Sequence, residues 1–265
     1  MNARNETRKL AFEQCENREM MAGNVAAAMY GDQLVIQGDN QSNSIEVSEI
    51  GNNVVQIKAA NGTTVNGATT AYFFNPSDKI NAFMNGGDDM LIIHNNPGRT
   101  TTFNNVYINM GSGRDQLAFW GTSVFGNATV VMGAEWENDA DYLDIGKHPL
   151  DPNPNSPQAN FWANLDVKTG GGDDSIAFRE KTNVFGNVSL RTGAGKDSVR
   201  IDQMYAARDF FADLGSGDDQ MNAGGLYARG NVWIDAGYGY DLYLGSMNYL
   251  SWNKATLSRF ERINR

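Results

Sequence analysis

A glycine-rich turn that ends in aspartate recurs seven times along the chain, and an alternating apolar segment follows each copy. The closing aspartates are Asp89, Asp115, Asp141, Asp174, Asp197, Asp219 and Asp241. Successive copies are separated by 26, 26, 33, 23, 22 and 22 residues. One unit of this length cannot bury its own apolar face, so such repeats stack on one another. The chain is therefore predicted to be a solenoid and not a compact enzyme.

Apolar residues recur at every second position on both sides of each turn, which is the period of a strand with one buried face. Two columns precede the turn: Val106, Ala128, Leu165, Val188, Phe210, Val232, and then Ile108, Val130, Val167, Leu190, Ala212, Ile234. Two more follow it: Leu91, Leu117, Leu143, Ile176, Val199, Met221, Tyr243, and then Ile93, Phe119, Ile145, Phe178, Ile201. We expect each column to stack in register along the core.

A second corner carries one residue type six positions before each turn: Asn105, Asn127, Asn164, Asn187, Asp209 and Asn231. If the coils stack in register, these side chains form a ladder, as asparagines do in stacked strands. We expect an internal ladder, with Asn187 buried between Asn164 and Asp209. Antiparallel hairpins would not align one residue type at one corner. The pattern predicts an all-β, right-handed parallel β-helix.

The continuous repeat indicates a single domain of about seven to eight coils, a rod on the order of 35 Å long. Residues 1–23 are expected to be a separate leader segment and residues 24–79 an N-terminal cap with the first coil. A hairpin is predicted there, 45–47 against 54–57 around Gly51. Residues 80–247 form the repeat coils. The tail, 248–265, lacks the repeat and is expected to cap the last coil.

Composition narrows the range of partners. The 265 residues carry a net charge of −10 with a pI near 4.7, which disfavours general attraction to nucleic acid or anionic lipid. No apolar run approaches the roughly 20 residues of a membrane helix, so membrane insertion is not expected. Cys15 is the only cysteine, so no intramolecular disulfide is possible, and a free thiol is expected.

The turn and its strand resemble the RTX, or haemolysin-type, calcium-binding repeat, whose pattern is G-G-x-G-x-D-x-(apolar)-x. Four copies fit its fourth, sixth and eighth places: Gly113, Asp115, Leu117; Gly172, Asp174, Ile176; Gly195, Asp197, Val199; and Gly217, Asp219, Met221. The resemblance implies calcium at the turns. The family's β-roll repeats every nine residues with turns at both edges, whereas here one turn occurs per coil, so its geometry does not carry over.

The N-terminal segment from Phe12 to Ala22, F-E-Q-C-E-N-R-E-M-M-A, is similar to the F-E-Q-L-E-D-R-R-x-L-A leader of many exported proteins of planctomycete-type bacteria. Cys15 replaces the leucine, Asn17 the aspartate and Glu19 the second arginine. The resemblance implies a secreted or cell-surface protein of a bacterium and nothing about activity.

Stacked carboxylates about 5 Å apart repel by roughly 3 kcal/mol per pair at an effective dielectric of 20. Calcium held by carboxylates and turn carbonyls would neutralise them, and so would inward-pointing backbone N–H groups. Arg114 and Lys196 precede two of the aspartates and suggest salt bridges between coils. Both alternatives stay open. The candidate metal ligands are Asp89, Asp115, Asp141, Asp173, Asp174, Asp197, Asp218, Asp219 and Asp241.

One region interrupts the repeat. Residues 134–140 lengthen the third turn, and 147–159 add a loop rich in proline and asparagine. Insertions in solenoids collect on one face, which is often the binding face. Trp136, Asp139, His148, Asp151 and Trp162 are the candidate ligand face, with a purely decorative loop as the alternative.

The sequence predicts a non-enzymatic, exported β-helix with a structural, adhesive or matrix role and calcium as its candidate cofactor. The alternative is a polysaccharide lyase or hydrolase, or a carbohydrate-binding module, that uses the insertion at 134–162. The histidines, His94 and His148, are expected in solvated loops and not as catalytic bases. The candidate partners are a polysaccharide or a cell-surface protein.

Overall fold

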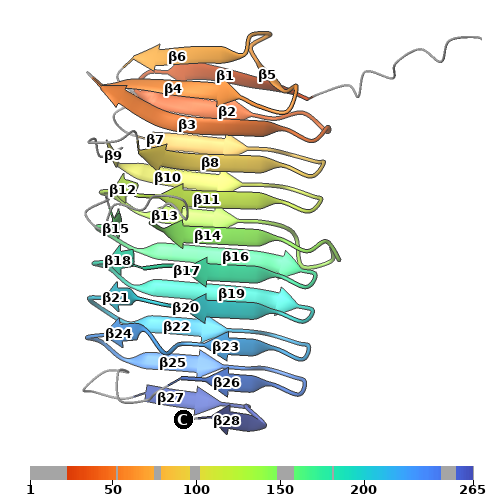
Figure 1. Cartoon of the computed structure of the whole chain (residues 1–265), viewed down its shortest axis with the longest axis vertical. Coiled ribbons are helices and arrows are strands. Elements are labelled where there is room, and N and C mark those ends of the chain that lie inside the picture. The colour runs from red at the N-terminus through yellow and green to blue at the C-terminus, as the bar shows by residue number, and fades with distance from the viewer. Residues whose placement is uncertain are drawn as a thin grey trace, which may run out of the picture.

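The computed structural model describes residues 23–51, 53–74, 79–95, 102–147, 158–180, 182–245 and 255–264. Within these ranges the chain forms strands and turns and no helix. The strands stack as parallel coils in a β-solenoid of about 7 turns (Figure 1). The all-β parallel β-helix is therefore confirmed. The leader lies almost wholly outside the described residues, as do Cys15, His148 and Asp151.

Three sheets run along the rod. The first contains, in spatial order, β5 (Thr64–Val65), β1 (Asn24–Tyr30), β2 (Gln33–Gln37), β7 (Lys79–Phe83), β10 (Asn105–Asn109), β13 (Ala128–Val131), β16 (Leu165–Gly171), β19 (Val188–Ala194), β22 (Phe210–Asp213), β25 (Val232–Asp235) and β27 (Ala255–Ser258). The second contains β6 (Thr70–Phe74), β4 (Val54–Ala59), β3 (Ser44–Gly51), β8 (Met90–Asn95), β11 (Gln116–Trp120), β14 (Tyr142–Gly146), β17 (Ser175–Phe178), β20 (Ser198–Ile201), β23 (Gln220–Asn222), β26 (Leu242–Leu244) and β28 (Arg262–Asn264). The short third sheet contains β9 (Thr102–Phe103), β12 (Ser123–Val124), β15 (Ala159–Phe161), β18 (Thr182–Val184), β21 (Met204–Ala206) and β24 (Leu226–Ala228).

The residues of each predicted apolar column are paired between neighbouring strands in the structure. In the first sheet Val106 pairs with Ala128, Ala128 with Leu165 and Leu165 with Val188, and the column continues to Val232. The columns of the second sheet align in the same way. All four columns are buried, because alternate side chains of each strand face the space between the sheets.

The two ends of the rod are built differently. At the N-terminal end β3 and β4 form the predicted hairpin, in which Val47 pairs with Ile57, and β4 pairs antiparallel with β6. At the other end the tail, expected to cap the last coil, lies against β25 and β26 as a further coil. Its strands β27 and β28 pair in parallel with β25 and β26 and add a last coil in register. Phe260 then packs against the ring of Tyr243, with centroids 5.5 Å apart.

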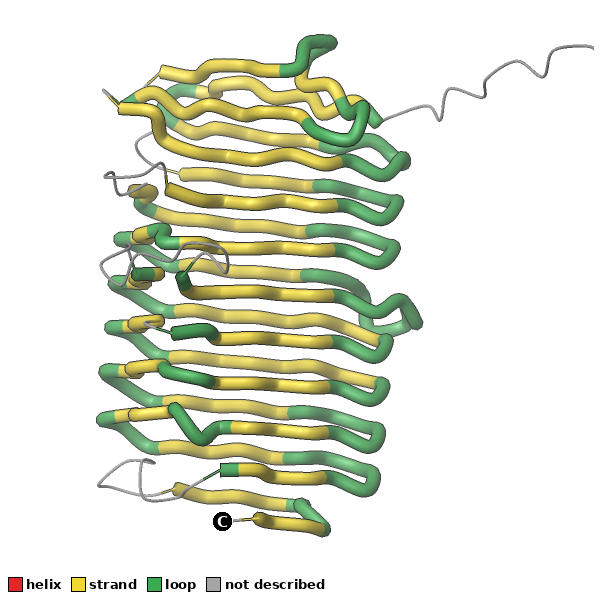
Figure 2. Tube along the Cα trace, viewed as in Figure 1, coloured by secondary structure: helices red, strands yellow, loops and turns green. Residues whose placement is uncertain are grey.

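The glycine-rich turns stack along one edge of the rod, at the right in Figure 2. Gly195, Gly217 and Gly239 have φ between 130° and 149°, a region that other residues rarely adopt. A Cβ at Gly217 would also overlap the carbonyl oxygen of Gly195 in the preceding coil. Glycine is needed here both for the backbone angle and for the close approach of successive coils.

The asparagine corner forms a ladder, but not the buried one that the sequence predicts. Asn187 and most of its column are exposed. The bonds run from backbone to side chain: the Asn187 N–H donates to Oδ1 of Asn164 at 2.9 Å, and the Asp209 N–H donates to Oδ1 of Asn187 at 3.2 Å. The closely packed position at this corner is Gly186 and not Asn187, because a Cβ added to Gly186 would overlap the backbone of Ala163.

Candidate functional site

The closing aspartates form a continuous buried ladder inside the turn edge. The N–H of Asp89 donates to Oδ1 of Asp115 at 2.8 Å, and the N–H of Asp115 donates to Oδ1 of Asp141 at 2.8 Å. The same bond joins Asp141 to Asp174, Asp174 to Asp197, Asp197 to Asp219 and Asp219 to Asp241, at 2.8 or 2.9 Å. Each carboxylate thus replaces a backbone carbonyl as the acceptor at the point where the chain turns.

Both ends of this ladder are closed by other residues. The N–H of Asn43 donates to Oδ1 of Asp89 at 2.7 Å, and the N–H of Asp241 donates to Oε2 of Glu261 at 2.6 Å. Glu261 lies in the tail, where the sequence shows no glycine-rich turn, so its role could not be predicted from the repeat. It supplies a carboxylate where the repeat itself has ended.

The second oxygen of the ladder carboxylates faces a different environment. Oδ2 is buried without a hydrogen-bond partner within the described structure in Asp89, Asp115, Asp174, Asp197, Asp219 and Asp241. Burial away from water is the main cause that raises the pKa of Asp115 to about 8, and the neighbouring carboxylates Asp141 and Asp89 add to it. Burial raises the pKa of Asp89, Asp141 and Asp219 to about 7 and that of Asp197 to about 6. Burial therefore opposes ionisation of these carboxyl groups, and a bound cation would favour it.

Backbone groups of the turns form hydrogen bonds with the neighbouring coils. The N–H of Gly195 donates to the Ser216 carbonyl and the N–H of Ser216 to the Gly193 carbonyl, both at 2.8 Å. The carbonyl oxygen of Gly195 lies against Gly217. A cation at the ladder would therefore rely on the inner carboxylate oxygens. In the residues that the structure describes, no cluster of three or more His, Cys, Asp or Glu is placed to hold a metal ion.

A second, exposed row of acidic residues lies beside the ladder. The N–H of Lys196 donates to Oδ1 of Asp173 at 2.8 Å, and the N–H of Tyr240 donates to Oδ1 of Asp218 at 2.9 Å. Of the salt bridges predicted between coils, that of Arg114 is present: its Nη2 lies 3.5 Å from Oδ2 of Asp88 in the preceding coil. Asp173 and Asp218 thus act in this structure as acceptors for the next coil.

Among the described members of the predicted ligand face, Trp136 and Asp139 lie apart from Trp162. Trp136, 87% exposed, and Asp139 belong to the lengthened loop between β13 and β14, on the turn edge. Trp162 follows β15, which lies at the opposite edge in Figure 1. His148 and Asp151 lie outside the described residues.

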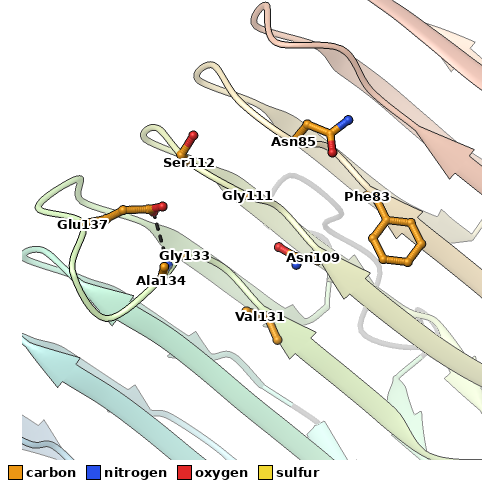
Figure 3. A pocket seen from close by; sticks show the side chains of 9 residues that line it. All are labelled: Phe83, Asn85, Asn109, Gly111, Ser112, Val131, Gly133, Ala134 and Glu137. Atoms are coloured by element: carbon orange, nitrogen blue, oxygen red, sulfur yellow. Dashed lines mark hydrogen bonds between the residues drawn. The ribbon is translucent and has the colours of Figure 1, made fainter.

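A hollow of about 420 Å³ adjoins the lengthened loop and is shown in Figure 3. Phe83, Asn85 and Asn109 line it together with Glu137, whose Oε2 accepts the N–H of Ala134 at 3.2 Å. Glycoside hydrolysis uses a pair of carboxyl groups across the scissile bond. The lining of this hollow contains one, Glu137, and that group closes its own loop.

An aromatic stripe, which the sequence analysis did not predict, follows the third sheet. It consists of Phe125, Trp162, Phe185, Tyr205 and Tyr227, and the centroids of successive rings are 4.5–6.2 Å apart. Trp162 and Phe185 are stacked at 4.5 Å with 13° between their planes. Phe125, Trp162 and Tyr227 are 50%, 48% and 41% exposed. The stripe therefore presents ring surface to solvent along five coils.

Comparisons with protein-family models, with curated proteins and with solved structures each return no match to this chain. The RTX and leader resemblances therefore rest on the sequence motifs alone. In the part of the chain that the structure describes, no helix is long and apolar enough to span a bilayer.

Proposed function

We propose that this protein is a non-catalytic structural rod, exported to the bacterial surface or beyond, that serves as an adhesive or matrix element. The observation that carries this proposal is the buried aspartate ladder, which links every repeat coil to the next through a charged or polar acceptor. Solenoids depend on contacts between neighbouring repeats for their stability. A ladder continuous from Asn43 to Glu261 supports a role as a stiff spacer. Export rests on the leader resemblance.

The alternative function is polysaccharide turnover at the hollow beside the lengthened loop. We expect acidic polysaccharides incubated with the full chain to yield neither unsaturated products nor new reducing ends. The one carboxylate in that lining, Glu137, accepts the N–H of Ala134, and its neighbour Asp141 belongs to the buried ladder. Product analysis by absorbance and by reducing-end assay checks this. Turnover that disappears in Glu137→Gln, His148→Ala or Asp151→Ala would replace the structural proposal with the enzymatic one.

Calcium is proposed as a stabilising ion at the ladder, with the inner carboxylate oxygens as donors. A ligand that binds only the folded state adds RT ln(1 + [L]/Kd), about 2.7 kcal/mol at a hundredfold excess over Kd. We expect millimolar calcium to raise the melting temperature of chelator-treated protein by several degrees. The gain is expected to shrink in Asp219→Asn, because the next coil carries Tyr240 and not a basic residue beside this aspartate, so calcium is needed there. It is expected to persist in Asp115→Asn, because Arg114 already offsets negative charge at that turn. Equal melting temperatures with and without calcium would show that the aspartates act without metal.

A further inference from the structure

The last coil leaves the apolar core of the rod unfinished. Ile263 pairs with Tyr243 and so continues a core column of the second sheet. Tyr243 is fully buried, whereas Ile263 is 38% exposed, because β28 is the last strand of its sheet in the described structure. Leu257 likewise pairs with the buried Ile234 but is only half-buried. The C-terminal end therefore presents core-facing side chains and two strand edges that have no partner among the described residues.

At the opposite end of the rod, β6 is the outermost strand of the second sheet (Figure 1). Its sequence, T-A-Y-F-F, contains no charged residue and no proline, the residues with which natural edge strands prevent pairing to another chain. The N–H of Ala59 donates to the Thr69 carbonyl, so by antiparallel alternation the backbone groups of Ala71 and Phe73 face β4 and those of Tyr72 face away. The outer edge of β6 is therefore free to accept a further strand.

The strand directions at the two ends of the second sheet match. β4 is antiparallel both to β3 and to β6, so two reversals return β6 to the direction of β3. β3 is parallel to β8, and the later strands of this sheet keep that direction as far as β28. The β6 strand of a second copy can therefore pair in parallel with β28, as the repeat coils pair with one another. In the first sheet β5 runs opposite to β27, so pairing there would be antiparallel, as it is between β1 and β2.

The two ends of the rod also differ in the sign of their charge. Residues 248–265 contain four basic residues and one acidic residue, a net charge of +3 in a chain whose total is −10. Residues 24–74 contain four acidic residues and one basic residue, a net charge of −3. The basic set is Lys254, Arg259, Arg262 and Arg265, against Glu261, and the acidic set is Asp32, Asp39, Glu46 and Glu49, against Lys58. Unlike ends attract and like ends repel, which favours contact between the N-terminal end of one rod and the C-terminal end of another.

We propose that the rods assemble head to tail, with the β6 edge of one copy paired to the β28 edge of the next. The contact covers Ile263 and Leu257 and continues the second sheet from copy to copy. A contact between two different surfaces that does not close into a ring produces an open filament. This inference rests on the proposed structural role and names a second copy of the chain as the partner of the rod.

The test is sedimentation velocity of the full chain from micromolar to near-millimolar concentration, with negative-stain electron microscopy of the assembled species. We expect the mean sedimentation coefficient to rise with concentration and the images to show linear filaments. Tyr72→Pro removes an outward N–H of β6 and is expected to prevent growth. The matched control is Tyr72→Val, which keeps that N–H and should still assemble. Both variants lose the bond from Nε2 of Gln56 to the Tyr72 hydroxyl, so that loss cannot explain a difference between them.

The opposite edge is blocked by Ile263→Pro. The N–H of Arg262 donates to the Asp241 carbonyl, so the N–H of Ile263 points away from β26. Each proline variant alone should stay monomeric, whereas an equal mixture of Tyr72→Pro and Ile263→Pro should form dimers and stop there, because each copy keeps one intact end. This result distinguishes head-to-tail contact from contact between two identical ends.

A charge reversal tests the electrostatic part of the proposal. Arg262→Glu is expected to raise the concentration needed for half-maximal assembly roughly tenfold, because it weakens attraction to the acidic end. Arg208→Glu makes the same change at an exposed position between β21 and β22, away from both ends, and should leave that concentration unchanged. Thermal melting verifies that each variant is folded, and Arg262→Glu carries the test if a proline variant does not fold.

A wild-type chain that stays monomeric at near-millimolar concentration would overturn the proposal. So would assembly by Tyr72→Pro alone, or wild-type dimers that do not grow, since both indicate contact between identical ends. The structural function is tested separately by the search for polysaccharide turnover. A rod that is monomeric and without turnover would therefore contradict this inference alone.

Discussion

Gly217→Ala is expected to destabilise the rod by on the order of 2–5 kcal/mol. Gly217 has φ of 137°, so any side chain imposes backbone strain of about 1–2 kcal/mol or more. The new Cβ would also overlap the Gly195 carbonyl oxygen, which is backbone and cannot rotate away. Forcing atoms into such a site costs a further 1–3 kcal/mol or so. Urea unfolding followed by circular dichroism measures the loss.

Two glycines of the same chain separate these contributions. Gly67 has φ of 78° with no heavy atom within 4 Å of an added Cβ, so Gly67→Ala is expected to cost only the backbone term, about 1 kcal/mol. Gly224 has neither constraint, since its nearest contact is Oδ1 of Asn222 at 3.4 Å, and Gly224→Ala should be close to neutral. If Gly217→Ala were no worse than Gly67→Ala, the close stacking of the turns would be wrong.

Asp115→Ala is expected to cost about 1–3 kcal/mol, because it leaves the buried N–H of Asp89 without its acceptor.

Asp115→Asn keeps an oxygen in that place and removes the charge. Its effect should depend on pH. Below about pH 4 the wild-type carboxyl is protonated in both the folded and the unfolded state, so the two proteins should have similar stability. Above pH 8 the wild type carries a buried charge that the variant lacks, so the variant should be the more stable protein.

The two main sheets could be predicted because their strands are long enough to show alternation, and because the turn fixes the phase of each coil. The third sheet could not. Its strands are two or three residues long, too short for a period of two to be recognised. The aromatic stripe also changes column between Phe185 and Tyr205, so no single offset from the turn contains all its rings.

The hydrogen bonds of the aspartate and asparagine ladders were only partly predictable from the sequence. Recurrence showed that the aspartates and asparagines stack, but not whether each side chain bonds to another side chain or to backbone. In both ladders the donor is a backbone N–H, and the two ladders run in opposite directions: Asp115 accepts from the preceding coil, whereas Asn164 accepts from the following one. Burial at the aspartate edge and exposure at the asparagine edge follow from how the chain turns, which the repeat spacing does not encode.

The central claim is that buried carboxylates with raised pKa values join the coils. An unfolded aspartate titrates near 3.9, whereas in the folded rod the pKa is raised to between about 6 and 8 in five ladder residues: Asp89, Asp115, Asp141, Asp197 and Asp219. The folded state therefore binds more protons in that interval. The stabilisation from these protons is complete below about pH 4 and is lost as pH rises through the folded pKa values. Arg259 lowers the pKa of Asp235, so the contribution of Asp235 to stability changes with pH only below about pH 4.

The most direct test is the free energy of unfolding of chelator-treated protein, measured in urea from about pH 5 to pH 8. The account predicts that stability falls steadily as pH rises across this range, with a shallower fall in Asp115→Asn. Stability that stays constant or increases toward pH 8 would show that the ladder carboxylates are ionised at little cost, and would contradict the account.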